Sequence, residues 1–441
     1  MFDEEKDLKK WKEEIEKKEV QDVQLETAIL EGFRQAKEKK VKKQRRFMKR
    51  SIWTSVAAAI LLLTFITSIR VSPAFANAVA SIPGMARFVE TIQSDKGLQL
   101  AIENEHFQQI GVSKETENMK VTLEGLITDE TTMVAFLTID EKRFSPESRP
   151  EFRILNLEGD VVSKSRSIGA SFEYTDTQRI ATTEVEFEFA ETVPSGELVL
   201  EYEVQEAGDG ETIEIIQIPF ENTLQPIKKE QFIINETAVI EGQKIHIRSV
   251  TIGSLKTAVE VEFDEENTKK IFDIEDLALI DDTGEVWSSI NNGVIARETD
   301  NPNVMFYYLQ SNYFKETNHL TLTFSKLMAM DRDEAFVVID TDKKRIIRQP
   351  PLNLFSNLTV NGSFIEIEMK SERGVHRDPF TILLDADGNK VESNSQGSIN
   401  PFEKDMTIHF QISGEQYKNP LTLPLSFYPS YINGNVSITI K

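Results

Sequence analysis

The sequence predicts a mainly β protein, in which tandem immunoglobulin-like β-sandwich modules are joined through one transmembrane helix to a short helical segment. Three observations lead to this fold class. Residues 51–69 form an uncharged apolar stretch long enough to cross a bilayer. Short strands with alternating apolar and polar residues follow it, and they recur in the same order three times. The residues before it carry apolar side chains at helical spacing instead.

Six segments are therefore expected along the chain. About 370 residues follow the apolar stretch, enough for two to three domains with cores of their own. Breaks at Pro226 and at Pro350-Pro351 separate the repeated units. The expected segments are a cytoplasmic helical segment (1–50), the transmembrane helix (51–69), a juxtamembrane helical linker (70–115) and β-sandwich modules at 116–226, 227–350 and 351–441.

The apolar stretch has the length and the flanks of a membrane span. At about 1.5 Å rise per residue, residues 51–69 cover roughly 28 Å as a helix, close to the hydrocarbon thickness of a bilayer. Ten Lys or Arg lie between Arg34 and Arg50, against the single acid Glu38, whereas Arg70 and Arg87 are the only early cations on the other side. The positive-inside rule therefore predicts a cytoplasmic N-terminus and extracytoplasmic C-terminal modules in the cell membrane.

A second interpretation of the same region stays open. Ala74-Phe75-Ala76 has the small-residue pattern of a signal-peptidase site, and cleavage there would release a secreted chain. The fifty residues before the apolar stretch, and its length, favour an uncleaved anchor instead, because signal peptides have short n-regions and shorter apolar cores.

Charge and cysteine content exclude several classes of function. Residues 1–50 carry 16 basic and 12 acidic side chains, and Arg70 adds one cation, so 33 basic and 61 acidic side chains are left for residues 71–441. A net charge of −28 on that part excludes nucleic acid as its partner. The chain has no cysteine, which excludes disulfides and thiolate metal sites.

The N-terminal segment predicts two short amphipathic helices. Their apolar residues recur every three or four positions, and isolated helices of this length are marginal in water, so the apolar side should have a partner. Another protein, the inner leaflet and the two helices themselves all qualify. The candidate partner-binding residues are Leu8, Trp11, Ile15, Leu25, Ile29 and Phe33.

The region around the membrane stretch carries a recognisable motif combination. A basic run and a single apolar span are followed by R-V-S-P-A-F-A at 70–76 and by I-P-G at 82–84. From about Val23 to Asp140 the sequence resembles a family of single-pass proteins of Gram-positive bacteria that is described as a domain of unknown function. Members are often encoded beside extracytoplasmic-function sigma factors. The resemblance implies an anti-sigma factor that binds a sigma factor on the cytoplasmic side, and without His or Cys in residues 1–50 it would be of the zinc-free type.

The three repeated units each contain a hairpin around an acidic-Gly turn. These hairpins are expected at 155–159, 279–284 and 383–388. Each unit then ends in a strand and a closing strand, at 197–202 with 213–216, at 319–324 with 336–339, and at 421–427 with 436–440. Units of this kind are typical of tandem β-sandwiches.

No catalytic, cofactor or metal site is predicted. The histidines are scattered, and neither a nucleophile elbow nor a Gly-rich phosphate loop is present. Residues 385–389 have some features of a calcium loop, but Lys390 occupies the position that needs Gly, which favours a hairpin turn. Acid pairs such as Asp331 and Asp333 are interpreted as ordinary surface charge. We therefore expect no enzyme.

Aromatic clusters leave a ligand-binding alternative open. The clusters at 306–308, 313–314 and 427–431 are expected to fill cores, but an exposed cluster would favour stacking on a sugar or peptide. The two functional hypotheses are an anchored regulator of a sigma factor and a surface-anchored binding or wall-associated protein with no transcriptional role. The expected partners of the chain are a sigma factor on the cytoplasmic side, the lipid bilayer and an unknown extracellular ligand.

Overall fold

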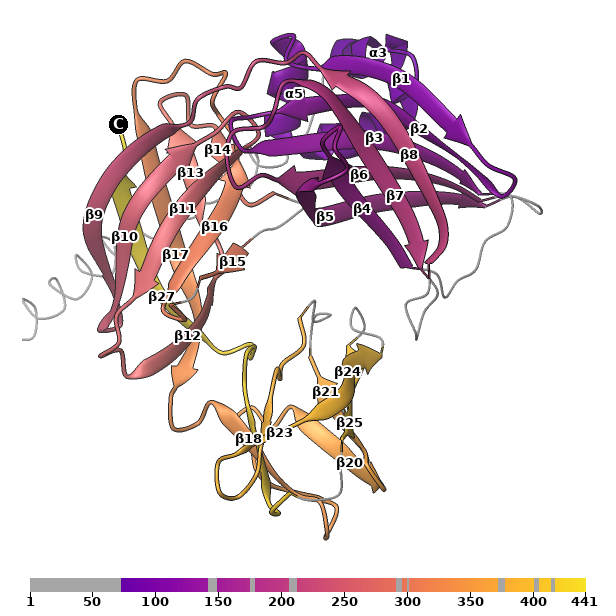
Figure 1. Ribbon diagram of the computed structural model, residues 1–441. Coiled ribbons are helices and arrows are strands. Elements are labelled where there is room, and N and C mark those ends of the chain that lie inside the picture. The colour runs from indigo at the N-terminus through magenta and orange to yellow at the C-terminus, as the bar shows by residue number, and fades with distance from the viewer. Residues whose placement is uncertain are drawn as a thin grey trace, which may run out of the picture. The chain divides into compact units, whose positions relative to one another are not determined.

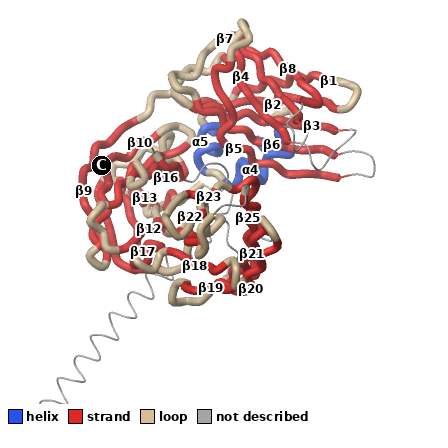
Figure 2. The backbone as a smooth tube through the Cα atoms, turned by 60° about the horizontal axis from the view of Figure 1, so that its bottom comes forward, coloured by secondary structure: helices blue, strands red, loops and turns tan. Residues whose placement is uncertain are grey.

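The computed structural model describes residues 73–141, 149–174, 179–205, 212–290, 296–299, 301–371, 377–399, 404–413 and 417–441. Strands dominate these residues and form several sheets, so the chain is mainly β as predicted (Figures 1 and 2). The predicted cytoplasmic segment and transmembrane helix lie outside this part of the chain. Among the described residues, no helix has the length and apolar character needed to cross a membrane.

The predicted juxtamembrane linker is helical over most of its length. Pro73 occupies the first position of the first helix, where its missing N–H costs nothing. Pro83 and Gly84 end that helical run, and Gly84 has a φ of 83°, which favours glycine. The helical elements are α3 (Pro73–Ser81), η1 (Met85–Phe88), α4 (Val89–Ser94) and α5 (Lys96–Glu103), and strand β1 (Gln108–Glu115) takes up the end of the predicted linker.

The first predicted module forms one eight-stranded antiparallel sheet, not a two-sheet sandwich. Its strand order is β1-β2-β3-β6-β5-β4-β7-β8, and bulges interrupt most of the pairings and bend the strands. The sheet rolls around its own core until its edges meet, where the Gln108 side chain donates to the Glu221 carbonyl and accepts from the Thr223 N–H. The strands after β1 are β2 (Met119–Thr128), β3 (Thr132–Glu141), β4 (Arg149–Leu155), β5 (Val161–Tyr174), β6 (Arg179–Glu188), β7 (Gly196–Gln205) and β8 (Thr212–Asn222).

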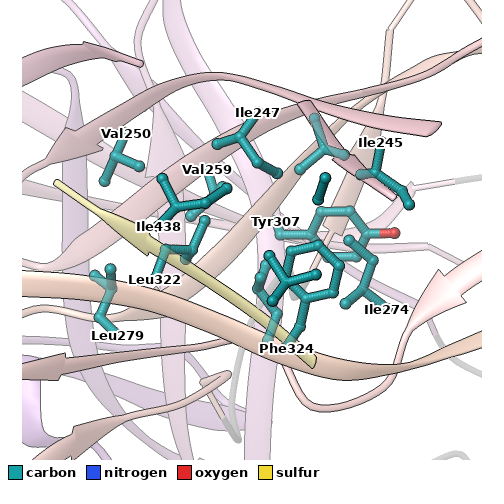
Figure 3. Close-up of a cluster of buried hydrophobic side chains, with 14 of the residues drawn as sticks. Ile245, Ile247, Val250, Val259, Ile274, Leu279, Tyr307, Leu322, Phe324 and Ile438 are labelled. Atoms are coloured by element: carbon teal, nitrogen blue, oxygen red, sulfur yellow. The ribbon is translucent and has the colours of Figure 1, made fainter. Parts of the chain in front are cut away.

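Two further sheets face each other across a shared core and form a sandwich (Figure 3). Alternating residues of both sheets, such as Val259 from one and Leu322 from the other, fill this core. One sheet contains β9 (Glu230–Ile240), β10 (Gln243–Ile252), β11 (Lys256–Phe263), β15 (Ala296–Glu298) and β16 (Val304–Gln310), and the other β12 (Lys269–Ile274), β13 (Ala278–Asp281), β14 (Val286–Trp287), β17 (Leu320–Asp331) and β27 (Tyr431–Thr439).

The last two sheets form a second, smaller sandwich around a separate core. Phe272, Met328 and Met330 reach this core from the neighbouring sandwich. Its first sheet holds β18 (Phe336–Asp340), β19 (Arg345–Arg348), β22 (Leu383–Leu384), β23 (Lys390–Val391) and β26 (Leu421–Pro424), and its second β20 (Phe355–Asn361), β21 (Phe364–Lys370), β24 (Ser393–Ile399) and β25 (Asp405–Ile412).

The two sandwiches exchange the closing strands that the sequence predicts for them. Strand β17 pairs with β27, and β18 pairs with β26, whereas the sequence pattern suggested β17 with β18 and β26 with β27. The smaller sandwich is therefore an insertion between β17 and β27. The two connecting segments run beside each other, since the Ala329 N–H donates to the Ser430 carbonyl and the Leu425 N–H to the Ala335 carbonyl. The predicted boundary at residue 350 falls between β19 and β20, which both belong to the smaller sandwich.

The three predicted hairpins are confirmed, and their turns are alike. They connect β4 with β5, β13 with β14, and β22 with β23. In each turn a side-chain oxygen of Asn156, Asp281 or Asp385 accepts from the backbone N–H four residues later, at 2.8, 3.0 and 2.9 Å. The turn glycines at 159, 284 and 388 all have φ between 81° and 88°, a conformation that favours glycine.

Candidate functional site

The helices that follow the predicted membrane span pack into a junction between the rolled sheet and the larger sandwich. They cover the outer face of β2 and β3, where Phe88 meets Phe136 edge-on with ring centroids 5.3 Å apart. The tip of the β10–β11 hairpin enters the same apolar cluster through Leu255. We call this region the helical junction. It comprises residues 94–98, 129–131, 184–188, 253–256, 285–287 and 310–315 together with the apolar cluster Phe75, Val79, Met85, Phe88, Ile92, Leu98, Ala101, Ile127, Val134, Phe136 and Leu255.

Asp95 fixes the start of α5 inside this junction. Its carboxylate accepts from the backbone N–H groups of Gly97, at 2.8 Å, and Leu98, at 3.1 Å, and so caps the helix. A Cβ at position 97 would lie 2.4 Å from the Leu255 carbonyl oxygen, so only glycine lets the hairpin approach this closely. Burial raises the pKa of Asp95 to about 6, although the two N–H groups act in the opposite direction.

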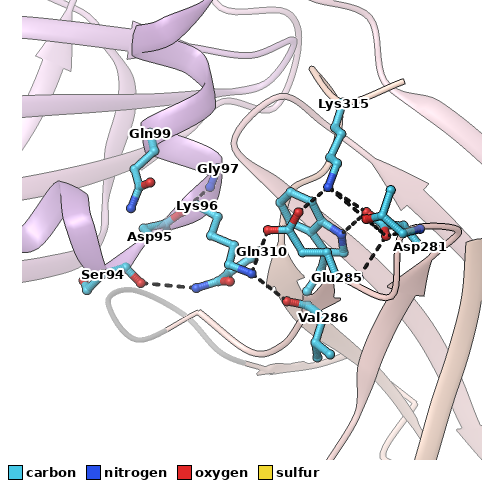
Figure 4. A network of polar contacts seen from close by, with 12 residues as sticks. Ser94, Asp95, Lys96, Gly97, Gln99, Asp281, Glu285, Val286, Gln310 and Lys315 are labelled. Carbon is cyan, nitrogen blue, oxygen red and sulfur yellow. Dashed lines mark hydrogen bonds and ion pairs between the residues drawn. The ribbon is translucent and has the colours of Figure 1, made fainter. Parts of the chain in front are cut away.

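Lys96, the next residue, connects α5 to the β13–β14 hairpin (Figure 4). Its ammonium donates to Glu285 Oε1 at 3.0 Å and to the Val286 carbonyl at 2.9 Å, and lies 5.1 Å from the centre of the Trp287 ring. Lys315 also pairs with Glu285, so one carboxylate is held by two ammonium groups. These contacts join residues far apart in the sequence.

Asp281 stabilises the hairpin that Lys96 contacts. Its buried carboxylate accepts from the Thr283 N–H, from the Trp287 indole N–H at 3.3 Å, and from Lys315 at 3.1 Å. Burial alone would raise the pKa of Asp281, but these hydrogen bonds outweigh it and lower the pKa to about 2. The carboxylate is therefore ionised throughout the ordinary pH range.

A row of three glutamates on β6 faces the junction. Glu184 and Glu186 stand opposite Phe136 and Val134 in the β3–β6 pairing, on the face that the helices cover. Glu186 pairs with Lys256 of the larger sandwich, and Glu188 pairs with Arg297 at 3.1 Å. The first two of these glutamates thus lie on the side of the sheet that carries the apolar cluster.

Glu184 differs from its two neighbours on the strand because no cation is paired with it among the described residues. It is only 8% exposed, and its Oε1 atom has no hydrogen-bond partner within the described part of the chain. Burial, together with the nearby charge of Asp95, raises the pKa of Glu184 to about 8. A protonated carboxyl is therefore expected here at neutral pH.

The β2–β3 turn completes the junction. Asp129 is fully buried and accepts from the N–H groups of Thr131 and Thr132 at 2.8 and 2.7 Å. Lys229 donates to the Thr131 hydroxyl at 2.5 Å and lies 3.6 Å from Asp129. The turn and the segment leading into β9 are thereby held together beside Gly253.

Of the residues that the sequence singled out, Phe75 lies in the junction, and most of the others lie elsewhere. Phe75 of the possible signal-peptidase site is buried in the apolar cluster of the junction. Asp331 pairs with Lys269 at 2.8 Å, and residues 385–389 form the expected hairpin turn. No group of three metal-binding side chains occurs within the described residues. The predicted partner-binding residues Leu8, Trp11, Ile15, Leu25, Ile29 and Phe33 are outside the part of the chain that the structure describes.

The aromatic clusters mostly fill cores. Tyr307, Tyr308 and Tyr428 are buried. Tyr431 is 38% exposed, but the Lys326 ammonium lies 3.6 Å from its ring centre. Sequence reasoning missed the junction, although the alternation E-V-E-F-E at 184–188 places three glutamates on one face of a strand.

Two segments of the chain match known families. Residues 46–141 match the family described as a domain of unknown function (DUF4179), and residues 229–369 match a family of unknown function (DUF5643). The resemblance to a domain of unknown function is thus confirmed for the first segment. The helices belong to the first match and the β10–β11 hairpin to the second, so the helical junction joins the two.

Comparisons with whole proteins give only distant likenesses. No curated protein matches the sequence. A conserved domain protein from Bacillus anthracis is 15% identical with a TM-score of 0.36, over 55% of this chain and 84% of that one. The cycloalternan-forming enzyme from Listeria monocytogenes is 8% identical with a TM-score of 0.13, over 69% of this chain and 29% of that one. Neither likeness is close enough to support an argument.

Proposed function

We propose that this chain is a single-pass membrane protein and an anti-sigma factor, whose cytoplasmic helices hold an extracytoplasmic-function sigma factor while the outer modules respond to envelope conditions. The proposed span is residues 51–69, with the N-terminus inside. Its support is the apolar stripe of the N-terminal segment and the family resemblance described above. The immunoglobulin-like character of the two sandwiches belongs to the same proposal.

One observation on the described residues carries the signalling part of this proposal. Helix α3 begins at Pro73, four residues after the proposed span, and buries Phe75 and Val79 in the helical junction. The helical segment after the proposed span therefore packs on the rolled sheet through this cluster, and its Lys96 reaches the larger sandwich through Glu285. A change that opens the junction would free this segment, which is the kind of two-state element that coupling across a distance requires.

The sigma-factor hypothesis is tested with the full-length chain purified in detergent. Wild-type protein should co-purify with a sigma factor identified by mass spectrometry, and L25D/I29D/F33D should lose it because three charges enter the apolar stripe. The matched control Q24D/T27D/Q35D adds the same charge at polar positions and should retain the sigma factor. If the wild-type chain retains none, the regulatory assignment fails.

A second candidate function is a surface-anchored binding protein. It is favoured by a cavity of about 970 Å³ in the smaller sandwich, lined by polar groups and one tyrosine. Deleting residues 1–34 separates the two functions. A sigma-dependent set of genes should switch on under the regulatory proposal, whereas transcription should stay unchanged for a binding protein. The polar and aromatic residues lining the cavity are Asp342, Ser363, Asn394, Tyr417, Lys418 and Asn419.

A further inference from the structure

We propose that the helical junction is a pH-sensitive clamp, which tightens in acid and loosens as the outside becomes alkaline, and that the proton on Glu184 beside Asp95 is its switch. The role of this clamp in signalling rests on the proposed function. The opening and closing of the junction does not rest on the proposed function, because it is a property of the described domains alone.

Two buried carboxyl groups border the apolar cluster of the junction: Glu184 stands opposite Phe136, and Asp95 accepts from the Leu98 N–H, with both Phe136 and Leu98 in that cluster. Glu184 comes from β6 of the rolled sheet and Asp95 from the start of α5, and they are 8% and 7% exposed. Asp95 uses its charge to cap α5, but Glu184 Oε1 has no partner among the described residues. Ionising both groups would place two negative charges close together where water is excluded.

The cations around the site are engaged elsewhere. Lys256 pairs with Glu186 and lies over the Tyr308 ring, Lys96 pairs with Glu285, and Lys229 binds Thr131 beside Asp129. His106, on the chain between α5 and β1, contacts the Thr128 carbonyl through Nε2 at 2.5 Å. In the junction, Glu188 pairs with Arg297 and Arg166, and Lys315 pairs with Asp281 and Glu285. Glu130 accepts from the Lys229 N–H at 3.3 Å.

Opening the junction would return Glu184 to water. The helices and Leu255 pack around Phe136, which stands directly opposite Glu184 in the β3–β6 pairing, and Glu184 is itself buried. In the open form the carboxyl group would regain an ordinary pKa, close to 4.5. Closing therefore takes up a proton at any pH between that value and about 8.

The sign of the pH dependence follows from this proton uptake. The closed form has the raised pKa, so the stabilisation from protonated Glu184 is complete below the open-form pKa and declines as pH rises towards about 8. Asp95 adds a second proton below its own pKa of about 6. Between pH 6 and pH 8 one proton is linked, so the opening equilibrium should rise roughly tenfold per pH unit and then level off.

Hydrogen exchange of the full-length chain in detergent tests this directly. Protection factors, which divide out the intrinsic rate, are measured between pH 6 and pH 9 for peptides that cover residues 96–103 and 253–257. In the wild type, protection should fall roughly a hundredfold from pH 6 to pH 8. Glu184→Gln cannot ionise and should show little change over this range. Glu188→Gln, on the same strand but paired with Arg297, should keep the wild-type slope.

A second variant keeps the test decisive if Glu184→Gln does not fold. Asp95→Asn retains a helix-capping side chain but removes the charge next to Glu184, so the levelling-off should move to lower pH. A wild-type protection profile without a slope, or an Asp95→Asn profile identical to it, overturns the clamp. Sigma-factor retention measured on the same samples reports on the proposed function separately, since its loss would leave the exchange result intact.

Discussion

Lys315 forms ion pairs with two carboxylates of the β13–β14 hairpin. It reaches both Asp281, which is buried, and Glu285, which is half-buried, and lies 5.5 Å from the centre of the Trp287 ring. Burial opposes the charge on Lys315, but the hydrogen bonds to Glu285 and Asp281 outweigh it and raise its pKa. The β13–β14 hairpin that Lys96 contacts therefore depends on this ion cluster.

Replacing Lys315 with Met should make the protein more sensitive to acid. The pKa of Asp281 is depressed to about 2, so this group contributes stability above its ordinary pKa that is lost as pH falls through about 2. Without the Lys315 donor the depression is smaller, and the midpoint of acid unfolding should move up by roughly half a pH unit. Trp287 fluorescence measures this transition, in a background in which Trp11 and Trp53 are replaced by Phe. Lys418→Met, at an exposed pair with Asp387, should leave the midpoint unchanged.

The β10–β11 hairpin is the element of the larger sandwich that contributes a large apolar side chain to the contact with the helices. Gly253 lies so close to Asp129 that a Cβ there would be 2.9 Å from its Oδ2, and the Ser311 hydroxyl donates to the Gly253 carbonyl at 2.5 Å. Leu255 follows, 5% exposed, within a cluster otherwise made by the helices, β2 and β3. One short hairpin thus brings a large apolar side chain into the core of another domain.

Leu255→Ala should open the junction without unfolding the domains. Truncating a buried leucine costs about 2–5 kcal/mol, and here the loss falls on the contact between domains. Exchange at residues 96–103 should become faster while β10 and β11 stay protected. Leu157→Ala is the matched control, because Leu157 is 62% exposed in the β4–β5 turn and should change little. Equal exchange in the two variants would show that Leu255 does not hold the junction.

Elements were predictable from the sequence where the signal is local, and not where it depends on distant pairing. The three hairpins were predicted from an acidic residue and a glycine close together in each turn, and all three occur. The exchange of β18 and β27 between the sandwiches depends on which of several similar strands pair across roughly a hundred residues. The alternation of apolar and polar residues is the same whether β17 pairs with β18 or with β27, so the sequence does not distinguish the two pairings. The contact of Lys96 with Glu285 spans 189 residues and has no periodic signature. Within the helical junction, a local sequence pattern is carried by the alternating glutamates of β6.

At the scale of the whole molecule, the chain order of the sandwiches has a consequence for truncation. Strand β27, the last described strand, supplies Ile432, Val436 and Ile438 to the core of the larger sandwich, and Ile440 follows directly after it in the same core. The smaller sandwich is inserted between β17 and β27, whose residues Met328 and Tyr431 are directly paired. Its two connections therefore leave and return at one point.

Removing the insertion should leave the rest of the described protein folded, whereas a cut at the boundary that the sequence suggests should not. Replacing residues 333–429 with a short Gly-Ser turn keeps β17 and β27 paired. It exposes the apolar side chains of Phe272, Met328 and Met330, which costs a few kcal/mol at about 25 cal/mol per Å². It also removes the ion pair of Asp273 with Arg377 and the hydrogen bond of Lys270 to the Leu425 carbonyl. Deleting residues 351–441 instead removes β27 with its three buried side chains, and Ile440 after it, so the larger sandwich should unfold and the helical junction with it. Thermal unfolding and hydrogen exchange of β10 and β17 distinguish the two variants. If both fold equally well, or both fail, the insertion is not a separate domain.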